Sequence, residues 1–158
     1  MKIIKPDVER VWQSYSRSIQ SLAYAYLKNK QDAEDVAQDV LITYLTKSPT
    51  FASAQKEKAW LITVAANRCK SLLRSNRKKE QPLPEDLSYL PKEEYDVMTA
   101  MLKLDAKYRL PLHLFYYEGY SIAEIGKILK CRPSTVGSWL ARGREKIKNE
   151  LGEDYFEE

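Results

Sequence analysis

SIAEIGKILKCRPSTVGSWLARGREKIK, residues 121–148, predicts a short helix, a tight turn and a second, basic helix. Ser121 followed by Glu124 is a capping-box pattern, which marks the start of the first helix. The CRP segment at residues 131–133 predicts the turn, and the second helix begins at Pro133 or Ser134. This order is typical of a helix-turn-helix unit, which indicates DNA as the class of partner.

The second helix of this unit separates into two faces at 100° per residue. Its apolar face is predicted to contain Val136, Leu140, Gly143, Ile147 and Leu151. Four polar side chains point away from that face: Ser134, Thr135, Ser138 and Arg142. Arginine reads guanine in a major groove and serine or threonine reads several bases, so we expect these four to contact duplex DNA. Trp139 lies at the border, and we assign it to the core.

The supporting helix before the turn is predicted to bury Ile122, Ile125 and Leu129. We expect Gly126 to let the next helix approach closely, because glycine has no Cβ.

Residues 56–79 predict a long amphipathic helix. Its core face is predicted to contain Leu61, Ile62, Ala65, Cys69, Leu72 and Leu73. The opposite face contains Trp60, Thr63, Val64, Asn67, Lys70, Ser71, Arg74 and Arg77. A basic face that also displays tryptophan suits phosphates and a stacked base. The alternative is that Trp60 packs against the first helix and the basic residues form a solvated surface.

Two further helices are predicted before it, over residues 7–28 and 33–46, and the second should bury Val36, Val40 and Tyr44. The second of them begins with acidic residues: Asp32, Glu34 and Asp35. The positive end of a helix dipole favours such residues in the first turn. Gln38 and Asp39 lie beyond that turn, so an acidic face remains that indicates a basic partner.

Composition excludes several classes of protein. The 158 residues suffice for one ordinary domain or two small ones, and no apolar run is long enough to span a membrane or form a signal peptide. We therefore expect a cytoplasmic protein without membrane insertion. One histidine and two cysteines on apolar faces assemble no catalytic or metal site, and no glycine-rich phosphate loop is present. We expect no enzyme, no cofactor and two buried free thiols.

The prolines divide the chain into two helical domains. Residues 80–91, EQPLPEDLSYLP, contain three prolines and no helical period, which indicates a linker. Helices are then predicted over residues 92–104 and 106–117, before the helix-turn-helix unit. The prediction is an all-α protein with domains at 1–79 and 92–152, followed by an acidic tail at 153–158.

Three segments in this order resemble the extracytoplasmic-function group of bacterial RNA polymerase sigma factors. They are DAEDVAQDVLITYL (32–45), AWLITVAANRCKSLLR (59–74) and YYEGYSIAEIGKILKCRPSTVGSWLARGREKI (116–147). The resemblance implies a sigma region 2 domain and a sigma region 4 domain that bind core RNA polymerase and direct it to particular promoters. It also raises an anti-sigma protein as a partner. This chain departs from the family pattern at Lys130, Gly137 and Trp139, which puts its duplex specificity in doubt. Lys130 replaces the glycine usual at the turn, where a non-glycine residue in the left-handed conformation carries a penalty of about 1 kcal/mol.

The resemblance assigns a role to each candidate residue. The contacts with core polymerase would be Asp32, Asp35, Gln38 and Asp39. The loop at residues 51–55 (with Phe51, Ala52 and Ser53) and Asn67 would capture an unstacked base of the minus-ten element. Trp60 would lie at the upstream edge of the melted DNA, and Lys70 and Arg74 would hold phosphates. The helix from Ser134 would read the minus-thirty-five element. The alternative function is a helix-turn-helix regulator with a helical partner-binding domain, which leaves the basic face at residues 56–79 unexplained.

Overall fold

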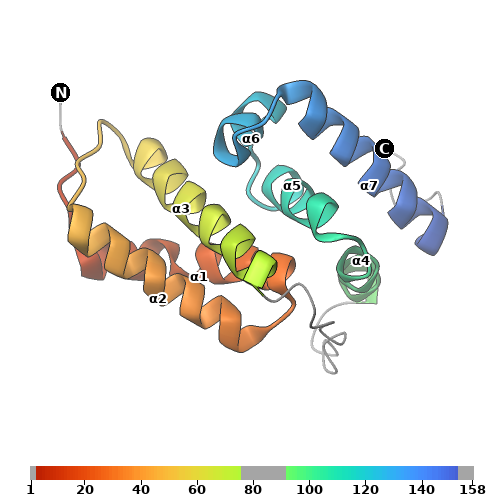
Figure 1. Ribbon diagram of the computed structural model, residues 1–158, viewed down its shortest axis with the longest axis horizontal. Coiled ribbons are helices and arrows are strands. Elements are labelled where there is room, and N and C mark those ends of the chain that lie inside the picture. Colours follow the sequence, from red (N-terminus) through yellow and green to blue (C-terminus); the bar gives the residue numbers. More distant parts are fainter. Residues whose placement is uncertain (1–2, 76–91, 153–158) are drawn as a thin grey trace. The chain divides into compact units, whose positions relative to one another are not determined.

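A computed structural model describes residues 3–75 and 92–152 of the chain (Figure 1). Their regular secondary structure is helical, and an isolated antiparallel bridge joins Ile4 to Phe51. The chain divides into two compact units, residues 1–80 and 81–158. The helices are α1 Val8–Leu27, α2 Lys30–Lys47, α3 Ala54–Ser75, α4 Lys92–Leu102, α5 Ala106–Tyr116, α6 Ile122–Leu129 and α7 Pro133–Leu151.

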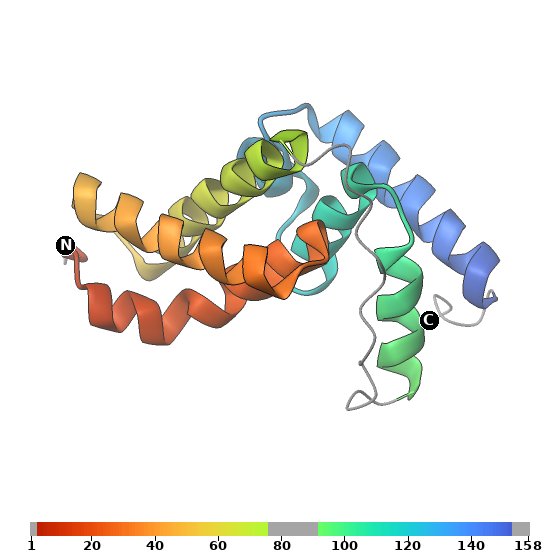
Figure 2. The ribbon, with the colours of Figure 1, turned by 60° about the horizontal axis from the view of Figure 1, so that its bottom comes forward.

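Helices α1, α2 and α3 pack against one another in the first unit, and Figure 2 shows α1 and α2 running side by side. The predicted core of α2 is confirmed, since Val36, Val40 and Tyr44 are each 0% exposed. In α3 the predicted core residues up to Cys69 are buried, whereas Leu72 and Leu73 are only half-buried. A helical wheel gives the direction of a side chain but not whether another element covers it.

Two helices of this unit begin earlier than predicted, because each has a polar cap that the periodicity does not reveal. Asn29 caps α2 by accepting the N–H of Asp32 at 2.9 Å, so the helix begins at Lys30. Ser53 caps α3 by accepting the N–H of Lys56 at 3.2 Å. The predicted loop at 51–55 is therefore shorter, with its last two residues inside α3.

Helices α4 to α7 form the second unit around contacts of α7 with α4, α5 and α6. The predicted capping box is confirmed: Glu124 N–H donates to Ser121 Oγ at 3.1 Å and Ser121 N–H donates to Glu124 Oε1 at 3.0 Å. Lys130 ends α6 in the left-handed conformation, with φ 56°, as predicted. The predicted core of α6 is partly wrong, because Ile122 is 36% exposed and Ile128, which was not predicted, is buried.

Gly126 marks the close approach within the helix-turn-helix unit, which is formed by α6 and α7 of Figure 1. A Cβ at this position would lie 2.9 Å from the carbonyl oxygen of Cys131, in the turn between α6 and α7. The expected close approach is confirmed, and its partner is the backbone of the turn. Pro133 begins α7, which suits proline because the first helical position needs no intrahelical N–H. Among the described residues, no helix has the length and apolar character needed to cross a membrane.

Candidate functional site

Trp60 stands at the junction of α3, α2 and the loop before α3. Its ring centroid lies 6.1 Å from that of Tyr44 in an edge-to-face arrangement, and 5.9 Å from that of Phe51. Trp60 is half-buried, so part of the ring faces solvent. Trp60 therefore packs against α2 and the loop, whereas the packing alternative named the first helix, and it remains partly accessible.

The predicted polar face of α3 continues from Trp60 along the helix. Asn67, Lys70 and Arg74 follow Trp60 by 7, 10 and 14 residues, which places all four within about 80° of arc. Asn67 and Arg74 are exposed, and Lys70 is half-buried. The structure therefore places an amide and two cations in line with one aromatic ring.

The loop residues predicted for base capture lie at the start of this face. Phe51 contacts Trp60, Ala52 is exposed and Ser53 is half-buried. Ser53 already has a structural role, since its hydroxyl caps α3. The backbone of Phe51 exchanges two hydrogen bonds with Ile4, at 2.7 and 3.1 Å, so the loop is attached to the N-terminal segment.

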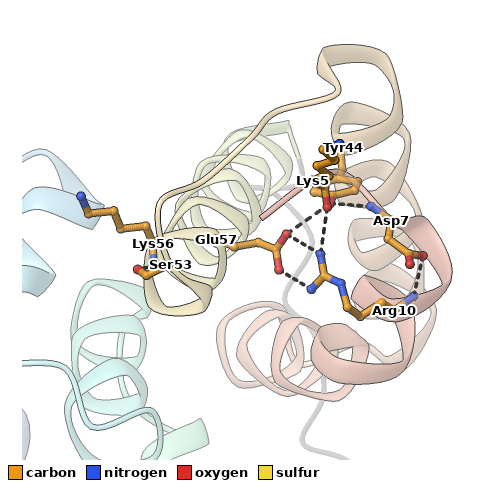
Figure 3. A network of polar contacts seen from close by, with 7 residues as sticks. All are labelled: Lys5, Asp7, Arg10, Tyr44, Ser53, Lys56 and Glu57. Carbon is orange, nitrogen blue, oxygen red and sulfur yellow. Dashed lines mark hydrogen bonds and ion pairs between the residues drawn. The ribbon is translucent and has the colours of Figure 1, made fainter. Parts of the chain in front are cut away.

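An ion pair between a buried carboxylate and a partly exposed arginine lies beneath this loop and was missed in the sequence. Glu57 of α3 is 0% exposed and accepts two hydrogen bonds from Arg10 of α1, at 2.6 and 2.9 Å (Figure 3). Tyr44 of α2 donates its hydroxyl to the same carboxylate at 3.2 Å. The hydrogen bond to Glu57 raises the pKa of Arg10, and burial raises the pKa of Tyr44.

The sequence held a signal for this pair. Glu57 precedes the fully buried Leu61 by four residues, which puts a carboxylate on the core face of an amphipathic helix. A charged group in such a position requires an opposite charge and hydrogen bonds. The helical wheel therefore predicts a basic partner for Glu57, although it does not identify Arg10 as that partner.

A second face lies on α2 and combines acidic, amide and apolar side chains. Asp35, Gln38, Ile42 and Leu45 are all exposed, and their spacings of three, four and three residues place them in one stripe. Ile42 is 58% exposed and Leu45 is 54% exposed, which is unusual for large apolar side chains. We call these four residues the α2 stripe. Beside it an open groove is lined by Val8, Glu9, Trp12, Gln38, Leu41 and Ile42.

The other two predicted acidic contacts lie at the edge of the α2 stripe, three residues before and four residues after Asp35. Asp32 is half-buried in the first turn of α2. Asp39 forms an ion pair with Arg68 of α3 at 2.7 Å, with about two fifths of each side chain exposed. Because α2 begins at Lys30, the first turn includes Asp32 but neither Glu34 nor Asp35. The helix dipole therefore accounts for less of the acidic character of α2 than the sequence indicated.

The predicted duplex-reading residues lie together on α7. Ser134, Ser138 and Arg142 are exposed and Thr135 is half-buried, whereas Val136, Leu140, Gly143 and Ile147 are buried. Trp139 and Leu151 were assigned to the core but are only half-buried. Gly137 has no neighbouring side chain or backbone atom within 4 Å of a Cβ placed there. The outer face of α7 is therefore open from its first turn.

Comparison with known proteins gives the same division of the chain. The model of the family "Sigma-70 region 2" matches residues 11–79, and that of "Sigma-70, region 4" matches residues 95–147. The chain is 28% identical to the ECF RNA polymerase sigma factor SigW of Bacillus subtilis, over 87% of this chain and 84% of that protein. It is 26% identical to the ECF sigma factor SigE of Mycolicibacterium smegmatis, over 92% of this chain and 62% of that protein.

A solved structure shares the fold. It is the sigma factor RpoE from Bartonella quintana in complex with the anti-sigma factor NepR, with a TM-score of 0.77 and 24% sequence identity. The likeness covers 92% of this chain and 97% of that one. Region 2 is thus the α1–α3 unit and region 4 is the unit with the helix-turn-helix. The order of these two regions and the relatives that share it show that the chain belongs to the extracytoplasmic-function group of RNA polymerase sigma factors.

Proposed function

We propose that this chain binds core RNA polymerase through α2 and directs the polymerase to particular promoters. The observation that carries the proposal is the α2 stripe, which exposes a carboxylate, an amide and two large apolar side chains. DNA phosphates repel a carboxylate, whereas a protein surface with basic and apolar groups fits the stripe. A protein with two DNA-binding faces therefore also has a face for a protein.

The two DNA faces divide the work of promoter recognition. The outer face of α7, with Ser134, Thr135, Ser138 and Arg142, reads the minus-thirty-five element as duplex. The residues around Trp60 take up bases of the minus-ten element as they leave the stack. Stacking a base on an aromatic side chain is worth about 1–3 kcal/mol, which offsets the few kcal/mol needed to unstack one step.

The remaining residues position the opened strand. Lys70 and Arg74 hold phosphates, and Asn67 with the loop at residues 51–53 captures one unstacked base. The chain itself makes and breaks no bond, since the polymerase supplies the chemistry. The domain that binds polymerase and the minus-ten element comprises residues 1–79, and the domain that binds the minus-thirty-five element comprises residues 92–152. The linker between them, residues 80–91, lies outside the described residues.

The two units are also the proposed binding sites of a regulatory protein. The solved relative is bound to an anti-sigma factor. We assign this chain a partner of that class, which would compete with polymerase or promoter DNA in the cytoplasm. Asp32 and Asp39 contact polymerase at the edge of the α2 stripe, and Asp39 also forms an ion pair with Arg68.

The test is a paired substitution in the α2 stripe, Asp35→Arg with Gln38→Ala. Because both side chains are exposed, the domain should stay folded while affinity for bacterial core polymerase falls on the order of 100-fold. Co-elution with core polymerase and promoter-dependent transcription are the measurements. The matched control is Asp105→Arg with Asn149→Ala, which makes the same charge reversal and a similar amide-to-alanine change at exposed positions of the other unit and should bind as the wild type does.

A chain that binds duplex DNA tightly alone and never associates with core polymerase would contradict the proposal. That outcome would favour the helix-turn-helix regulator. If the chain does associate with core polymerase, selection of DNA sites with the reconstituted holoenzyme supplies the promoter sequence for the experiments below.

A further inference from the structure

We infer that the Arg10–Glu57–Tyr44 network is a positioning device for base capture. It fixes Trp60 and the loop at residues 51–53 in the arrangement that receives unstacked bases. The inference rests on the proposed function, because it assigns these buried groups a role in minus-ten recognition. None of the three touches DNA in this account, and each acts through the loop or through Trp60.

The carboxylate of Glu57 joins all three helices of the first unit (Figure 3). Arg10 of α1 donates one hydrogen bond to each carboxylate oxygen, at 2.6 and 2.9 Å. Tyr44 of α2 donates to Oε2 at 3.2 Å, and its own oxygen accepts the N–H of Asp7 at 3.0 Å. Since the carboxylate is 0% exposed, these directional bonds hold it without competition from water.

Tyr44 connects this carboxylate to Trp60. The hydroxyl of Tyr44 is bound to Glu57, and its ring meets the ring of Trp60 edge to face. Glu57 also precedes Trp60 by three residues on the same helix, so the two side chains are neighbours along α3. The position of the tyrosine ring, and hence of the tryptophan, is therefore determined by the network.

The N-terminal segment connects the network to the loop. Arg10 donates a further hydrogen bond to the carbonyl oxygen of Lys5 at 3.3 Å. One residue earlier, Ile4 exchanges backbone hydrogen bonds with Phe51 at 2.7 and 3.1 Å. The ring of Phe51 then contacts Trp60. The loop is thus held on one side by this bridge and on the other by the Ser53 cap.

Polar groups suit this role better than apolar ones. The side chain of Arg10 is 36% exposed, so water screens its attraction to Glu57 and the pair is poor evidence for stability. Its directional bonds instead fix one geometry. A loop held in the receiving geometry before binding loses less conformational freedom when a base arrives, which strengthens capture.

The main test removes one oxygen atom. Tyr44→Phe keeps the ring against Trp60 but breaks the bonds to Glu57 and Asp7. The assay uses holoenzyme made with the full chain and a non-template-strand oligonucleotide from a promoter selected with that holoenzyme. Affinity for this single strand should fall on the order of fivefold, while association with core polymerase is unchanged.

Two further variants separate positioning from stability. Ile19→Val removes one buried methylene from the α1–α2 contact, away from the network. It should lower the melting temperature and leave capture at the wild-type level. Arg10→Met with Glu57→Leu removes both charges together, so no buried carboxylate is left without a partner; the unit should stay folded and capture should still weaken.

The outcomes distinguish this inference from the proposed function. Asn67→Ala changes an exposed residue assigned to base capture, and it should weaken single-strand binding without altering the fold. If Asn67→Ala weakens capture and the network variants do not, the positioning role is overturned and the proposed function stands. Equal loss of capture in Ile19→Val and Tyr44→Phe would also overturn it. If the wild-type holoenzyme captures no single strand, both proposals fail.

Discussion

Cys69 shows how burial alone sets the chemistry of a side chain. The thiol is 0% exposed, and burial raises its pKa to about 12. Because the pKa in the folded state lies above that in the unfolded state, the stability contributed by the protonated thiol is complete below about pH 9 and is lost as pH rises toward 12.

The expected result is selective alkylation. Cys131 was expected to be buried but is only half-buried. With iodoacetamide at pH 8 it should therefore react first, and Cys69 should react only when denaturant unfolds the first unit. Peptide mass spectrometry measures both. A Cys131→Ser variant gives the rate for Cys69 alone, and a native rate for Cys69 near that of Cys131 would contradict its burial.

Single residues also show what periodicity can and cannot predict. The wheel placed Trp60 opposite the core of α3 and identified Cys69 as buried. It contained no information on the contacts of Trp60 with Phe51 and Tyr44, because these come from another helix and a loop. Glu57 was missed for the same reason, since Arg10 lies 47 residues away in the sequence.

At the scale of elements, two glycines of the helix-turn-helix unit should respond oppositely to the same substitution. In Gly126→Ala the new Cβ would lie 2.9 Å from a backbone oxygen of the turn, so the turn must shift at a cost of about 1–3 kcal/mol. In Gly137→Ala the new methyl group meets nothing within 4 Å, and alanine favours the helix by up to about 1 kcal/mol.

Amide hydrogen exchange of α6 and α7 in the full chain measures both effects. Protection should fall in Gly126→Ala and rise in Gly137→Ala. The two variants serve as controls for each other, because the chemical change is identical. Loss of protection in Gly137→Ala would show that this glycine is needed for the conformation of α7.

The elements themselves were predictable where the sequence carries local signals. The capping box at Ser121 and the apolar face of α7 as far as Ile147 follow from neighbouring residues, whereas the left-handed Lys130 was expected from the family resemblance. The starts of α2 and α3 were misplaced because Asn29 and Ser53 act as caps ahead of the apolar period. Ile122 was assigned to the core by its spacing, yet it lies at the first position of α6, where it is partly exposed.

At the scale of the whole molecule, the order of motifs predicted two helical units and their family more surely than any one motif did. The α2 stripe could not be predicted completely from the sequence. Ile42 and Leu45 are apolar residues in an amphipathic helix, so their pattern is that of core residues. Their exposure appears only when α1 and α3 have taken the other faces of α2. A surface that binds a partner is thus the part of a helix that no other helix covers. Its apolar residues cannot be distinguished from core residues in the sequence alone.

The two proposed DNA faces belong to separate units, so substitutions in them should act independently on promoter use. Trp60→Ala removes the stacking surface and should impair opening of a duplex promoter more than use of a pre-melted one. Arg142→Ala removes one exposed cation from α7 and should weaken binding to both templates. The slope of log affinity against log salt should also fall by about 1 if Arg142 contacts a phosphate.

The double variant tests this independence. Its loss in binding free energy on the duplex promoter should equal the sum of the single losses within about 0.5 kcal/mol. Gel-shift and strand-opening assays with holoenzyme at several salt concentrations provide these values. Equal losses for Trp60→Ala on duplex and pre-melted templates would instead assign Trp60 to packing against Tyr44 and Phe51, because a residue that supports only the fold cannot distinguish closed from opened DNA.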